Sequence, residues 1–156
     1  MSVVNPHDAG ALKSIVAAGL LCGCLDLTAA LLNAQRMGLG SARVLQFIAS
    51  GVLGPRSFNG GAATAALGVA FHYTIAFGAS TVYYLASRQF SLLVEQPFIC
   101  GPVFGIAVFL FMNVIVLPLS ATPKRPMSAS SIAIQVGIHM VCVGLAIALA
   151  VSWASR

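Results

Sequence analysis

Residues 98–117 read FICGPVFGIAVFLFMNVIVL, and this stretch decides the fold class. It holds no charged side chain, and its length matches the about 20 helical residues that cross a hydrocarbon layer about 30 Å thick. Backbone N–H and C=O groups inside a bilayer must pair within the protein, which an α-helix achieves within one segment. The stretch therefore predicts a membrane-spanning helix.

Three further apolar segments have a comparable length, at residues 15–32, 62–86 and 132–153. Together with 98–117 they predict an all-α polytopic membrane protein, whose single domain of residues 1–156 is a four-helix transmembrane bundle. The composition agrees, because 59% of the residues are hydrophobic and 7% are charged, whereas soluble domains carry about 25% charged residues. An ordinary soluble enzyme, a disordered tail and a disulfide-stapled secreted domain are excluded.

Residues 41–53, between the first two spans, predict a shorter helix of a different kind. Val44, Phe47 and Ile48 fall on one helical face, whereas Arg43 and Gln46 fall on the other. A helix of about 13 residues is too short to cross the bilayer. We therefore expect an amphipathic interfacial helix that lies at the membrane surface or under the bundle.

The charged residues indicate a membrane partner and an orientation. Eight basic and three acidic residues give a net charge of +5. The basic residues are scattered at the ends of the apolar segments, so we expect the lipid bilayer as the partner and no nucleic acid. We call the membrane side that holds both termini and the second connection side A, and the side that holds the first and third connections side B.

Side B carries five basic residues against three on side A, which are Lys13, Arg88 and Arg156. Cytoplasmic connections carry an excess of Lys and Arg, so this bias places side B in the cytoplasm and both termini on the non-cytoplasmic side. The basic residues of side B are Arg36, Arg43, Arg56, Lys124 and Arg125.

Five acidic, imidazole or amide side chains fall inside the predicted spans: Asp26, His72, Asn113, Gln135 and His139. A charge near the bilayer centre costs about 3 kcal/mol, so such groups normally face the bundle and have partners. Counting 1.5 Å per residue from the midpoint of each segment places all five in the side-B half. We therefore predict one cluster that binds or relays a proton or a small polar ligand. Three basic residues lie at the side-B entrance to this cluster and would attract an anionic group there: Arg36, Arg43 and Arg56.

Other interpretations of these polar residues stay open. They could serve only to hold the helices together by hydrogen bonds. His72 and His139 lie at similar depths on different helices and could ligate haem b, or could bind zinc or iron together with Asp26. We predict no other cofactor. The chain could also be a non-catalytic subunit or assembly partner of a larger membrane complex, or it could form a homodimer.

No catalytic motif favours an enzyme. The sequence contains no Gly-x-Ser-x-Gly setting, no phosphate-binding loop and no dinucleotide fingerprint. The sequence therefore favours a non-enzymatic membrane protein and leaves open whether it catalyses a reaction.

Four strings carry a resemblance to a known family: GLLCGCLDLTAALL, MNVIVLPLS, IHMVCVGLAIAL and the run from Ile48 to Ser87. They resemble small, largely uncharacterised four-helix bacterial inner-membrane proteins of the YagU-like kind. The resemblance extends from about Gly19 to Leu149. It implies a location in the bacterial inner membrane and a link to acid tolerance, and it implies no catalytic residues.

Overall fold

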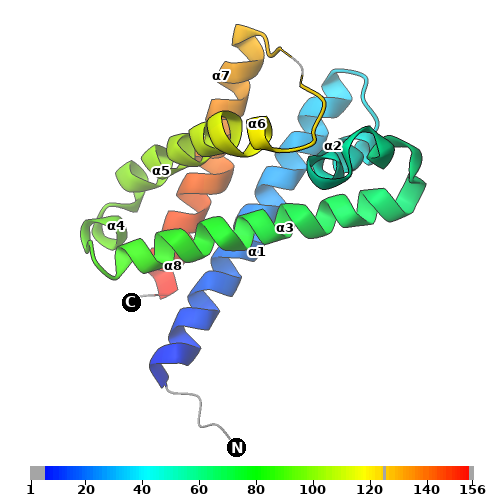
Figure 1. Cartoon of the computed structure of the whole chain (residues 1–156). Coiled ribbons are helices and arrows are strands. Elements are labelled where there is room, and N and C mark those ends of the chain that lie inside the picture. The colour runs from blue at the N-terminus through cyan, green and yellow to red at the C-terminus, as the bar shows by residue number, and fades with distance from the viewer. Residues whose placement is uncertain (1–5, 125, 155–156) are drawn as a thin grey trace, which may run out of the picture.

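The computed structural model of the chain describes residues 6–124 and 126–154, with side chains from Gly10 onward. No strand occurs in these residues, so the all-α prediction is confirmed. Four helical stretches among them are long and apolar enough to cross a membrane (Figure 1). They are Gly10–Arg36, Gly61–Ser87, Pro97–Leu119 and Ala129–Ala154.

Each observed span is longer than the apolar segment that predicted it. The first helix, α1, is Pro6–Arg36, and the second span is α3, Gly61–Ser87. A bilayer is about 30 Å thick in its hydrocarbon and about 40–45 Å thick with its headgroups. The apolar runs mark the hydrocarbon part, and the helices continue into the polar layers where small and polar residues are tolerated.

The third and fourth spans each contain a π-helical segment that the sequence did not indicate. The third span consists of α5 (Pro97–Phe111), the π-helical η2 (Met112–Val116) and α6 (Leu117–Leu119). The fourth consists of α7 (Ala129–Ile138), the π-helical η3 (His139–Leu145) and α8 (Ala146–Ala154). Such segments are rare and often occur at functional sites.

The spans pack in two pairs, α1 with α3 and α5 with η3, and glycines bring the helices of each pair close together. In the α1–α3 seam, Gly23 faces the ring of Tyr73. In the α5–η3 seam, Gly144 faces the backbone of Gly101 and Gly105 so closely that a Cβ on Gly144 would overlap both. α1 also packs against α8 and η3, which joins the two pairs into one bundle.

The best-buried apolar core lies toward side A, where Ala18, Tyr83, Ile147 and Val151 are almost fully buried. A short helix in the second connection, α4 (Leu92–Glu95), closes this end. The Tyr83 hydroxyl donates a hydrogen bond of 2.9 Å to the Leu93 carbonyl of α4. The Nζ atom of Lys13 lies 5.9 Å from the ring centroid of Trp153, so α1 begins where α8 ends.

The short helix predicted at residues 41–53 is present as α2, Ser41–Leu53, and a 3₁₀ turn, η1 (Gly54–Asn59), follows it. α2 packs against α3, where the Leu45 carbonyl lies against Gly68. Its buried residues are Gln46, Ala49 and Ser50. α2 therefore turns much of its polar face toward the protein, which an amphipathic helix on a water-facing surface would not do.

Candidate functional site

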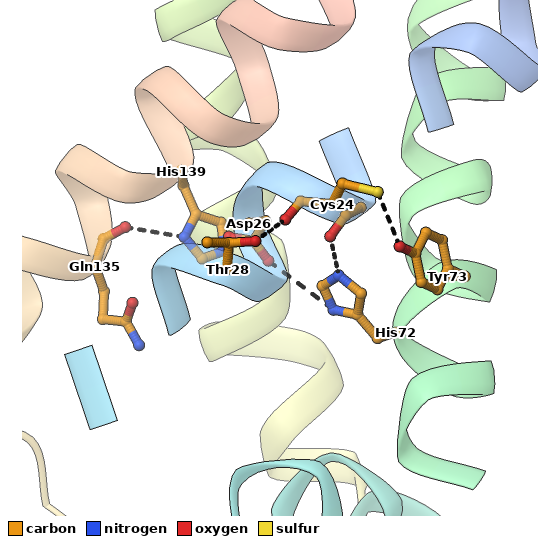
Figure 2. A network of polar contacts seen from close by, with 8 residues as sticks. Cys24, Asp26, Thr28, His72, Tyr73, Gln135 and His139 are labelled. Atoms are coloured by element: carbon orange, nitrogen blue, oxygen red, sulfur yellow. Dashed lines mark hydrogen bonds and ion pairs between the residues drawn. The ribbon is translucent and has the colours of Figure 1, made fainter. Parts of the chain in front are cut away.

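Asp26 and His72 are the two predicted site residues that the structure brings together. Asp26 lies on α1 and His72 on α3, and their Oδ2 and Nδ1 atoms are 4.0 Å apart (Figure 2). The Asp26 side chain is 19% exposed and the His72 side chain 12% exposed. The other ring nitrogen, Nε2, lies 2.9 Å from the carbonyl oxygen of Gly23 on α1. His72 thus contacts α1 through both of its ring nitrogens.

The tautomer of His72 follows from these partners. A carbonyl oxygen only accepts hydrogen bonds, so Nε2 carries a hydrogen and donates it to Gly23. In a neutral ring, Nδ1 would then present a lone pair to the Asp26 carboxylate, and two acceptors would face each other. One further proton on either group removes this conflict, and 4.0 Å fits an ion pair better than a direct hydrogen bond. The two groups therefore form an ion pair only when the His72 ring carries a hydrogen on both nitrogens.

Tyr73 extends the polar contacts of the α1–α3 seam. Its hydroxyl lies 3.1 Å from the sulfur of Cys24, and its ring packs over Gly23. The rings of Tyr73 and His72 meet edge to face, with centroids 5.6 Å apart. Tyr73 was not among the predicted site residues, although Gly19 and Gly23 form a small-residue pattern that indicates a close helix contact at this level.

His139 bonds to its own helix. Its Nδ1 atom donates to the carbonyl oxygen of Gln135 at 2.9 Å, and its ring packs on the edge of Phe109 with centroids 5.5 Å apart. In the neutral ring Nε2 therefore keeps a lone pair, and among residues 6–124 and 126–154 it has no hydrogen-bonding partner. Figure 2 shows the Gln135 side-chain amide directed away from His139.

Asn113 also bonds within its own helical segment, since its side-chain nitrogen donates to the Phe109 carbonyl at 2.8 Å. Asn113, in η2, and His139, in η3, thus both contact Phe109 of α5. In the described parts of the chain, neither has a direct polar contact with Asp26 or His72. In Figure 2, Asp26 is drawn between the rings of His72 and His139. A single five-residue cluster stays a prediction.

The three arginines predicted at the mouth are all exposed on side B. Arg36 lies in the last turn of α1, and Arg56 lies in η1. The guanidinium carbon of Arg43 lies 4.2 Å from the ring centroid of Phe58, which is a cation–π contact. Two of the basic residues counted from the sequence, Arg125 and Arg156, lie outside the described residues.

The geometry bears on the cofactor hypotheses as well. In the part of the chain that is described, no three His, Cys, Asp or Glu side chains are grouped so that they could hold a metal ion. Both nitrogens of His72 already face oxygen atoms, so ligation of a haem iron requires the ring to leave Gly23 or Asp26. The four cysteines are free thiols.

A comparison with family models, with curated proteins and with solved structures gave no significant match. The YagU-like resemblance, and the acid tolerance that it implies, therefore stay predictions.

Proposed function

We propose that this integral membrane protein binds a proton at the Asp26–His72 pair. The observation that carries the proposal is the arrangement of His72, whose Nε2 lies 2.9 Å from the Gly23 carbonyl while Nδ1 lies 4.0 Å from Asp26. When the pair holds this proton it is neutral overall, because a protonated His72 balances the Asp26 carboxylate. Without it, the membrane interior holds an uncompensated negative charge, which is costly in a low dielectric.

His139 supports a relay form of this proposal. Its free Nε2 atom is a second proton acceptor, and it belongs to η3, a segment that packs against α1. The π-helical geometry of η3 also fits a functional role. A proton would be held at Asp26–His72 and exchanged with His139, while Gln135 and Asn113 complete the polar surroundings.

Proton binding can be measured directly on the protein in liposomes. Infrared difference spectra recorded between acidic and neutral pH report the protonation of carboxyl and imidazole groups. We expect one titration event that disappears in both Asp26→Asn and His72→Gln. Glu95→Gln is the matched control, because Glu95 is an exposed acid outside the candidate spans; the event should persist in this variant.

Two outcomes would contradict the proposal. The event would have another origin if it persisted in Asp26→Asn. If the wild-type protein showed no such event and the variants only lowered stability, the pair would serve to hold α1 against α3. Proton flux through the liposomes, with and without His139→Gln, then separates a relay from a static binding site.

The haem b hypothesis is tested by the absorption spectrum of the purified protein. A Soret band that is lost in both His72→Ala and His139→Ala would favour it over proton binding. We prefer the proton, because the existing contacts of His72 leave neither ring nitrogen open to iron.

A further inference from the structure

The outward surface of α2 is apolar in a place where a connecting segment would normally be polar. Val52 is 67% exposed and Phe47 is 40% exposed. Two polar side chains of the helix, Gln46 and Ser50, are buried inside the protein instead. Gln46 donates to the Gly61 carbonyl at 3.1 Å, and Ser50 is buried 3.3 Å from the Thr122 hydroxyl. The surroundings that suit such a helix are acyl chains.

The position of α2 along α3 agrees with contact to lipid. Leu45, in the middle of α2, packs against Gly68, and Gly68 lies seven residues after the first residue of α3. At 1.5 Å per residue this is about 10 Å below the start of α3. The headgroup layer is about 6 Å thick on each side. The centre of α2 therefore lies near the edge of the hydrocarbon.

The charges around α2 are all of one sign. Arg43 lies near the start of α2 and Arg56 lies in η1, and both side chains are exposed. The contact with Phe58 restrains the Arg43 guanidinium group. No Asp or Glu occurs anywhere in the sequence between Asp26 and Glu95. Nothing acidic in this part of the chain neutralises the two arginines.

We propose that α2 and η1, residues 41–59, form a binding surface for an anionic phospholipid of the side-B leaflet. The phosphate binds at Arg43 and Arg56, and the acyl chains lie against Phe47 and Val52. Positive charge beside an apolar face complements this lipid, with charge at one level and hydrocarbon below it. A second copy of the chain is a poorer occupant, because a twofold contact through this face would bring the same arginines together.

The proposal is tested by native mass spectrometry of the protein taken from mixed phosphatidylglycerol and phosphatidylcholine. We expect the wild-type protein to retain phosphatidylglycerol selectively. In R43Q/R56Q the selectivity should fall about fivefold for each arginine removed, which is the factor expected for one basic residue near an anionic surface. The control K13Q/R88Q removes the same charge from side A and should keep the selectivity.

Further variants distinguish lipid binding from other causes. R43K/R56K keeps the charge but weakens the stacking on Phe58, and it should retain most of the lipid. Equal retention of both lipids by the wild-type protein would overturn the proposal. An equal loss in K13Q/R88Q would overturn it too, as would a dimer that V52R converts to a monomer, since the α2 surface would then bind a second copy. A misfolded R43Q/R56Q would be recognised by circular dichroism, and V52N, which removes acyl contact without adding charge, should then lower the retention of phosphatidylglycerol.

Discussion

The two seams of the bundle hold their helices together by different means. In the α1–α3 seam, side chains connect the helices: His72 meets the Gly23 carbonyl and Asp26, and Tyr73 meets Cys24. In the α5–η3 seam, the backbones themselves touch at Gly144, and the polar side chains bond within their own helices.

This difference separates two uses of polar residues in a membrane. An Asn or His that bonds to its own helix has a partner for one polar group and makes no hydrogen bond to the neighbouring helix. A His that reaches across adds an attraction between helices and brings ionisable groups together, where a proton can be shared. Substitutions in the two seams test this distinction.

Gly144→Ala should have the largest effect. The new Cβ would overlap the backbone of Gly101 and Gly105, and a backbone cannot rotate away as a side chain can. We expect a loss of about 3 kcal/mol in the free energy of unfolding, measured by titration with sodium dodecyl sulfate in mixed micelles. Gly137→Ala is the control on the same span, since a Cβ there would meet nothing within 4 Å. Equal stability of the two variants would show that the α5–η3 seam is not closely packed.

His72→Ala should cost more than His139→Ala. The first change leaves the Asp26 carboxylate without its partner, which costs about 3 kcal/mol for a buried pair. The second removes a bond within one helix and a contact with Phe109, worth about 1 kcal/mol. The same unfolding titration measures both variants. Adding Asp26→Asn to His72→Ala should recover part of the loss, and a further loss instead would mean that Asp26 has another partner.

Tyr73→Phe should have the smallest effect. It removes the contact between the Tyr73 hydroxyl and the Cys24 sulfur but keeps the ring over Gly23. Hydrogen bonds between membrane helices average about 0.6 kcal/mol, so we expect a loss of that size in the same titration. Cys24→Ala should cost a similar amount, and the double variant should cost no more than either single one. Additive losses would show that the two groups act independently.

The spans could be predicted from the sequence because hydrocarbon thickness fixes the length of an uncharged helical run. The limits of α2 were also predictable, from the alternation of apolar and polar positions. The face of α2 that meets the protein was not, because helical periodicity separates the two faces without saying which neighbour each one meets. The burial of Gln46 and Ser50 follows from partners distant in the sequence, Gly61 and Thr122.

For the candidate site, the sequence predicted how deep each polar residue lies in the membrane better than which way its side chain points around the helix axis. Counting residues placed Asp26 and His72 in the same half of the membrane, and they do form a pair. The direction in which His139 points depends on rotation around the helix axis. The π-helical turns of η2 and η3 change the number of residues per turn, so the positions of Asn113 and His139 around the axis could not be derived from a regular 3.6-residue period.

The contact between Lys13 and Trp153 has a consequence for biogenesis. The span synthesised first has part of its docking surface on the span synthesised last of the four, through α8. While the ribosome is still making the third span, the α8-facing side of α1 has no partner and must be shielded by lipid or by the insertion machinery. Assembly of this bundle therefore finishes only after the fourth span has left the translocon, and a nascent chain arrested earlier should be open to proteases that cleave within membranes.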